Sequence, residues 1–204
     1  MTDLTIGKTN VTKLLKQKYQ QLKKTGWVSL VQVPADNHMQ VNTEALKVLV
    51  NEMGYQCIYI TLGKPCTDLD KAYKKAGVET SNLYFIDAIS QMYGESATDT
   101  KRFIYTAGPL DIDSITAGLR NLLASIGEGK KCVFLDSVTT VLLYNSLPRT
   151  VRFSQFLTQT LKELGVTGIM VSVTKGESTN KLVTELSKLC DEVIDITGGG
   201  GQLA

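Results

Sequence analysis

The chain has 204 residues, of which 43% are hydrophobic and 21% charged, a composition typical of one soluble globular domain. The formal net charge of +2 argues against a strongly basic nucleic-acid-binding surface, although it leaves a local basic patch open. The single histidine and the absence of Cys-x-x-Cys spacing argue against a zinc site. No apolar stretch could cross a bilayer and Met1–Asn10 lacks a signal core, so we expect a cytoplasmic protein without a membrane partner.

Residues 1–26 predict an N-terminal helix that packs on the core. Apolar side chains recur there at helical spacing, at Val11, Leu14, Leu15, Tyr19 and Leu22. Lysines occupy much of the remaining surface, which favours a solvated helix face. The alternative is a docking helix for an acidic partner or for nucleic acid.

Strands and helices then alternate along residues 27–197, which we interpret as a single domain. Apolar runs predict strands at Trp27–Pro34, Gln56–Leu62, Leu83–Asp87, Arg102–Thr106, Lys131–Asp136, Thr167–Val173 and Glu192–Ile196. Helices are expected to begin at Asn42 or Thr43, Thr67, Asp113, Thr150 and Ser178 or Thr179, with a short helical turn at Val138–Tyr144 that Pro148 breaks. Such alternation indicates a three-layer, doubly wound α/β fold with a mainly parallel sheet.

Three segments are expected to differ from this order. Ser90–Lys101 is polar and indicates a surface loop, and the short strand after it is expected to lie apart from the main sheet. Residues 198–204 begin with four glycines and indicate a flexible tail.

The strand Lys131–Asp136 is expected at the centre of the sheet, because its apolar run suits a strand buried on both faces. Asp136 and Ser137 then lie at its carboxyl end, where open α/β sheets place ligands. In nucleotide-hydrolysing proteins an aspartate at this place holds magnesium. The structural alternative, which we favour, is that Asp136 binds backbone amides or caps the next turn.

An ordered set of segments resembles the RecA/KaiC-like ATPase superfamily, especially its small archaeal members. These segments are Tyr59–Leu62, Leu83–Ala88, Val133–Ser137, Leu161–Thr167 and Leu189–Ile194. The resemblance implies a RecA-like P-loop NTPase fold. For active relatives it also implies magnesium-ATP bound at subunit interfaces of rings or filaments.

The phosphate-binding loop is where the sequence departs from this family. The expected Gly-x-x-x-x-Gly-Lys-Ser/Thr motif falls on Ala35, Asp36, Asn37, His38, Met39, Gln40, Val41 and Asn42. This degenerate loop lacks both glycines, which let backbone amides approach phosphate, and the lysine that supplies charge. The acids that would activate water are also missing, since that place reads Leu62–Pro65. We therefore expect no catalytic residue and no cofactor, and Asp136 as a metal ligand only if magnesium-ATP binds.

The replaced loop contains residues for one further candidate site. Asp36, Asn37 and His38 are expected at the same sheet edge as Asp136, where two carboxylates and an imidazole could form a metal or acid–base site. A polar surface turn is the favoured interpretation.

Three functions follow as hypotheses. The first is a pseudo-ATPase that acts through protein–protein contacts, as a homo-oligomer or beside a catalytic relative. The second is an ATP-binding protein or ATPase with an atypical loop, and the third is a nucleic-acid-binding accessory module that uses the basic first helix.

Overall fold

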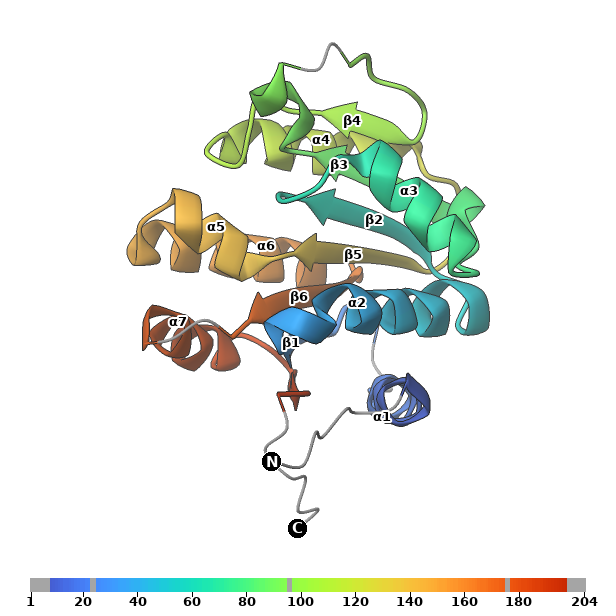
Figure 1. Ribbon diagram of the computed structural model, residues 1–204, viewed down its shortest axis with the longest axis vertical. Helices are drawn as coiled ribbons and strands as arrows, with labels where there is room; N and C mark the ends of the chain where they lie inside the picture. Colours follow the sequence, from blue (N-terminus) through green and yellow to red (C-terminus); the bar gives the residue numbers. More distant parts are fainter. Residues whose placement is uncertain (1–7, 23–24, 95–96, 175–176, 198–204) are drawn as a thin grey trace.

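The computed structural model describes residues 8–22, 25–94, 97–174 and 177–197, and these form a three-layer α/β fold (Figure 1). Seven parallel strands make one sheet in the order β4-β3-β2-β5-β6-β1-β7. They are β1 (Val28–Val33), β2 (Gln56–Thr61), β3 (Leu83–Asp87), β4 (Phe103–Tyr105), β5 (Lys131–Asp136), β6 (Thr167–Val173) and β7 (Glu192–Asp195). The three-layer, doubly wound fold predicted from the sequence is confirmed.

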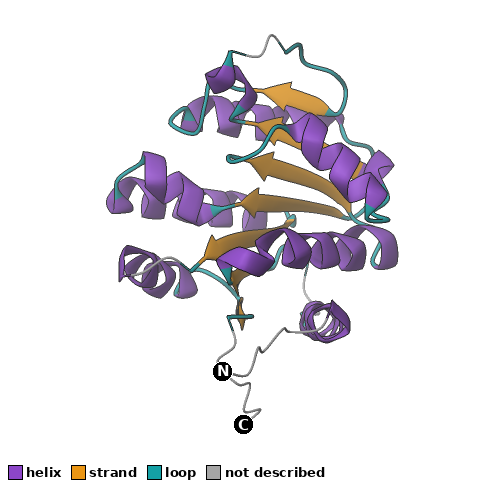
Figure 2. Ribbon diagram, viewed as in Figure 1, coloured by secondary structure: helices purple, strands orange, loops and turns teal. Residues whose placement is uncertain are grey.

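Helices cover both faces of this sheet (Figure 2). On one face lie α1 (Lys8–Gln21), α2 (His38–Leu46) and α3 (Cys66–Lys75); on the other lie α4 (Ile112–Ser125), α5 (Val138–Tyr144), α6 (Leu147–Glu163) and α7 (Glu177–Ser187). The side chains of each strand alternate between two hydrophobic cores, one beneath each helix layer. Continuous apolar runs are required because parallel strands are buried on both faces.

The first helix packs on the core through its apolar stripe. Val11, Leu15 and Tyr19 are buried, and the Tyr19 ring stacks on Trp27 with centroids 5.1 Å apart. Two lysines of α1 form ion pairs, Lys16 with Glu52 at 2.6 Å and Lys18 with Glu192 at 2.8 Å. The expected tail, residues 198–204, lies outside the described residues.

Strand β5 is central, as predicted, with β2 on one side and β6 on the other. Cys132, Val133, Phe134 and Leu135 are all buried. The Phe134 ring stacks on Tyr59 of β2 at 5.1 Å between centroids. This strand therefore joins both cores and fixes the position of Asp136 at its end.

Two predictions about the sheet edge and the first crossover helix were wrong. β4 does not lie apart from the sheet but extends it as a parallel edge strand beside β3. Helix α2 begins at His38 rather than at Asn42 or Thr43, because the 3₁₀ turn η1 (Ala35–Asn37) leads straight into it. It then continues as the π-helix η2 (Lys47–Glu52).

Smaller differences concern where other elements begin. α4 is capped by Asp111, whose carboxylate accepts from the Ser114 amide, and not by Asp113. Pro148 lies in the first turn of α6 instead of breaking a helix, since a helix needs no amide donor there. The segment expected as a loop contains a 3₁₀ turn, η4 (Ser90–Tyr93). Within the described ranges, no helix has both the length and the apolar character that spanning a membrane requires.

We expect Phe134→Ala to destabilise the fold by about 3–5 kcal/mol, because it removes a fully buried ring and leaves a cavity between two strands. Urea unfolding followed by circular dichroism measures this. The matched control is Leu164→Ala, at a side chain 59% exposed, which should change the unfolding free energy by less than about 0.5 kcal/mol. Equal effects of the two substitutions would contradict the central position of β5.

Candidate functional site

The candidate site begins with Asp136, the last residue of β5. Asp136 lies two residues after Phe134, so its side chain projects to the same face of the sheet, toward α2 and α3. Tyr59 lies opposite Phe134 in the neighbouring strand β2, on the same face. The two strands therefore bring a carboxylate and a phenol together at the carboxyl edge of the sheet.

Helix α2 supplies the other side of the site from its first turn. Since α2 begins at His38, the side chains of His38 and Asn42 are one turn apart and share a face. His38 Nε2 lies 2.5 Å from Asp136 Oδ1 and acts as its donor. Asn42 Nδ2 lies 3.1 Å from the same imidazole nitrogen and 3.1 Å from the Tyr59 hydroxyl.

A chain of hydrogen bonds continues from Asp136 into the core. The Tyr59 hydroxyl donates to Asp136 Oδ2, and the Tyr73 hydroxyl of α3 donates to that of Tyr59 at 2.8 Å. Burial, together with the negative charge of Asp136, holds the pKa of Tyr59 well above its usual value. Burial also raises the pKa of Tyr73. Both phenols are therefore neutral donors at ordinary pH, and both oxygens of the Asp136 carboxylate have partners.

The residues present do not fit magnesium-ATP as the family holds it. The amides of the replaced loop bond within it, Asn37 N–H to the Pro34 carbonyl and His38 N–H to that of Ala35, so they do not form a phosphate cradle. Val41 stands at the lysine position and is buried in the core. Magnesium needs open oxygen ligands, whereas His38 and Tyr59 engage both oxygens of Asp136.

The structure brings together only part of the second site weighed from the sequence. His38 reaches Asp136, but Asp36 and Asn37 lie in the 3₁₀ turn, where Asp36 is exposed. Among the described residues there is no group of three or more His, Cys, Asp or Glu side chains suited to a metal. An acid–base pair remains, without a third ligand for a cation.

Ser137 and Asp136 are adjacent in the sequence but have different roles in the structure. Ser137 caps α5, since its Oγ accepts from the Thr140 amide at 3.1 Å, which is a structural role. The sequence-based expectation that Asp136 binds backbone amides or caps a turn does not match the contacts, because its partners are the side chains of His38 and Tyr59.

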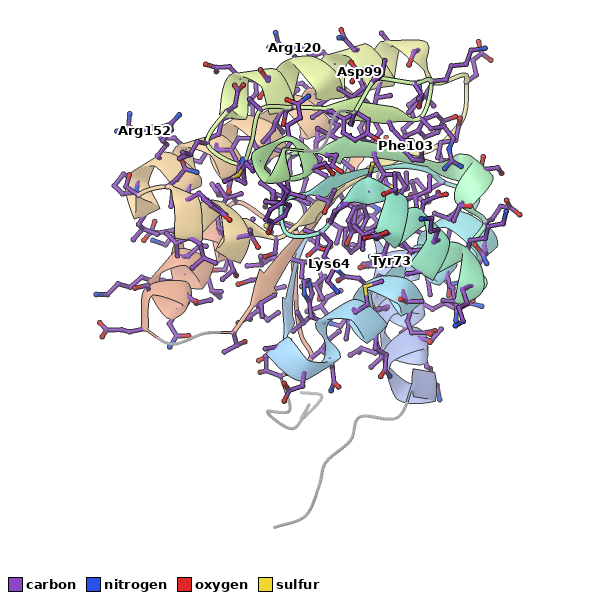
Figure 3. All side chains as sticks on the ribbon, turned by 45° about the horizontal axis from the view of Figure 1, so that its top comes forward. Lys64, Tyr73, Asp99, Phe103, Arg120 and Arg152 are labelled. Carbon is purple, nitrogen blue, oxygen red and sulfur yellow. The ribbon has the colours of Figure 1, made fainter. Side chains whose placement is uncertain are left out.

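A cavity of about 240 Å³ opens beside this pair at the carboxyl edge of the sheet. Its lining includes His38, Asp136, Gly63 and Lys64, with Leu143 of α5 on its rim. Lys64 is exposed, follows β2, and lies in the central part of the view in Figure 3. The lining of the cavity therefore combines polar side chains with apolar ones such as Met39 and Leu143.

Sequence reasoning missed Tyr59 and Tyr73 as members of the site. The available signal was the tyrosine itself, because a tyrosine in an apolar strand needs a partner for its hydroxyl. The parallel register then places Tyr59 diagonally from Asp136. It also missed Asp87, a buried carboxylate at the end of β3 that accepts from the amides of Cys66, Ile89 and Ser90. Asp87 orders the loops beside the site.

The fold, together with an aspartate at the end of the central strand, defines a P-loop-NTPase-type α/β protein. A family model described as "ATPase: KaiC" matches residues 45–198, so the chain belongs to the KaiC ATPase family and has a RecA-like fold. The matched range begins after the Ala35–Asn42 segment. A search of curated proteins found no match.

Two solved structures from Pyrococcus horikoshii share this fold. The KaiC-like protein PH0186 is 15% identical with a TM-score of 0.59, and the alignment covers 88% of this chain and 76% of that one. The protein PH0321, solved in complex with an unknown peptide, is 12% identical with a TM-score of 0.63, covering 93% and 84%.

We expect Tyr59→Phe to lower the unfolding free energy by about 1–3 kcal/mol, because it leaves Asp136 and Tyr73 each short of one buried hydrogen-bond partner. Chemical denaturation at neutral pH measures the change. The control is Tyr144→Phe at a half-exposed tyrosine, which should shift stability by less than about 0.5 kcal/mol. A neutral Tyr59→Phe would show that the network contributes nothing to folding.

Proposed function

We propose that the protein is a catalytically inactive KaiC-family module that acts through protein–protein contacts, as a homo-oligomer or beside a catalytic relative. The observation that carries the proposal is the 2.5 Å contact between His38 and Asp136. It ties up the carboxylate that active relatives would use for magnesium, and it comes from the helix that replaces their phosphate loop.

The loss of phosphate chemistry supports the proposal in a second way. Catalysis of phosphoryl transfer rests mainly on positioned positive charge around the phosphate. At the loop position this chain has Val41 in place of lysine, and after β2 it has Gly63 and Lys64 in place of an acid. A single exposed lysine outside a backbone cradle does not replace these groups.

The apolar rim of the cavity supports protein contacts at the same edge. Leu143 on α5 lines the cavity and is 70% exposed, and the next residue, Tyr144, which does not line the cavity, is 37% exposed. Aromatic side chains such as that of Tyr144 are enriched at protein-binding surfaces. The peptide bound to PH0321 is consistent with peptide binding by this fold.

Nucleotide binding is the second candidate, favoured by the cavity beside Asp136 and Lys64. Nucleic-acid binding through α1 is less well supported, because two of its lysines already pair with Glu52 and Glu192. Salt-dependent binding to single- and double-stranded DNA would test it.

We expect no ATP turnover and no rise in melting temperature with magnesium-ATP, since a ligand that does not bind the folded state cannot stabilise it. Thermal shift and phosphate release on the purified protein measure both. A strong concentration-dependent rise in melting temperature would replace this proposal with a nucleotide sensor. Steady turnover that Asp136→Ala abolishes would replace it with an ATPase.

We expect Leu143→Asp to weaken self-association or partner capture by at least about tenfold, because it places a charge in the apolar rim. Light scattering over a range of concentrations measures self-association, and pull-down from lysate compares partner capture by the variant and the wild type. Leu164→Asp, at another exposed leucine directly after α6, is the matched control and should leave association unchanged. Association that survives Leu143→Asp would move the contact surface away from this edge.

A further inference from the structure

A second surface lies between α4 and α6, on the other face of the sheet from His38. It is a groove of about 490 Å³, which we call the arginine groove, lined by Ile112, Asp113, Thr116, Ala117, Arg120, Arg149, Arg152, Phe153 and Phe156. The chain contains four arginines, and three of them line this groove. Figure 3 labels Arg120 and Arg152, whose side chains extend outward at the surface. Such a concentration of one residue type calls for a specific explanation.

These three arginines lack ionic partners within the described part of the chain. The fourth, Arg102, is fixed by Asp70 at 2.5 Å and by the Thr80 carbonyl. Elsewhere lysines on α1, η2, α3, α6 and α7 form ion pairs with nearby acids. In the groove Asp113 is the one acid of the lining, so it carries net positive charge.

Two of the arginines are nonetheless held in place. The Arg120 guanidinium lies 6.0 Å from the centre of the Phe156 ring, and Arg149 Nη2 donates to the Leu110 carbonyl at 3.2 Å. A pre-positioned guanidinium loses less side-chain entropy when it binds an anion. Its planar fork also matches a carboxylate with two parallel hydrogen bonds.

The floor of the groove is apolar. Phe156 is 42% exposed, and beneath it Phe153 packs with Ile115, Leu119 and Leu157 in the core of this face. Arginine and aromatic residues together are the combination enriched at protein-binding sites. The groove thus presents guanidinium groups and, beside them, an exposed aromatic ring against which one large apolar side chain could pack.

We propose that the arginine groove binds an acidic segment of a partner protein, with carboxylates on the three guanidinium groups and one large apolar side chain against Phe156. Nucleic acid is disfavoured, because three cations beside Asp113 make a short basic patch and not a track along a phosphate backbone. The groove lies on the opposite helix layer from the His38–Asp136 pair. Loss of the proposed function at that pair would therefore leave this inference standing.

The test uses the full chain and fluorescein-labelled peptides of the type Glu-Glu-Leu-Phe-Glu-Glu, read by fluorescence anisotropy. Binding should weaken at least about tenfold for Arg152→Gln or Arg120→Gln, and should fall steeply with salt. Phe156→Ala should weaken it as well, and a peptide with Gln in place of Glu should bind poorly. The matched control is Lys71→Gln, a cation 80% exposed on α3 in the other helix layer, which should bind as the wild type does.

Several outcomes would overturn the proposal. They are no binding of the acidic peptides, equal binding of the Gln peptide, or equal weakening by Lys71→Gln. Tighter binding of single-stranded oligothymidylate at the same arginines would identify a nucleic-acid surface instead. Melting temperatures of the variants are measured alongside, and unchanged values show that a loss of binding comes from the groove and not from unfolding.

Discussion

The carboxylate of Asp136 is the constraint on which the site depends. It stands at the end of the central strand of the sheet, where an unpaired charge would be costly. His38 and Tyr59 satisfy its two oxygens, and Tyr73 and Asn42 then satisfy Tyr59. The first turn of α2, strand β2 and helix α3 are therefore joined to β5 by one set of polar contacts.

This arrangement explains why the start of α2 differs from a phosphate loop. A phosphate loop needs glycine and unpaired inward amides, whereas here the 3₁₀ turn uses its own amides and brings His38 to the carboxylate. The imidazole lies beside the oxygen that a hydrated cation would need. The His38 side chain thus contacts the carboxylate oxygen that a magnesium ion would have to reach.

The two surfaces that we propose for partner proteins differ in their chemistry. The cavity at the carboxyl edge of the sheet has the exposed Leu143 in its lining, while the arginine groove combines charge with aromatic side chains. Leu143 lies on α5, in the same helix layer as α4 and α6 of the groove, whereas His38 lies on α2 in the other layer.

Periodicity and apolar runs determined the fold class, the central place of Lys131–Asp136 and the parallel order, because burial on both faces leaves a clear pattern in each strand. The first residues of the helices were harder to predict from the sequence. His38 was expected in a turn, yet it begins α2, because the 3₁₀ turn before it needs no glycine and no marked cap residue. The departure from the phosphate motif was visible in residues 35–42.

The tertiary structure decided that His38 and Tyr59 meet at Asp136, because this depends on the register of β2 against β5 and on where α2 begins. Likewise, Arg120 is separated from Arg149 and Arg152 along the chain, and only the packing of α4 against α6 brings the three to one groove.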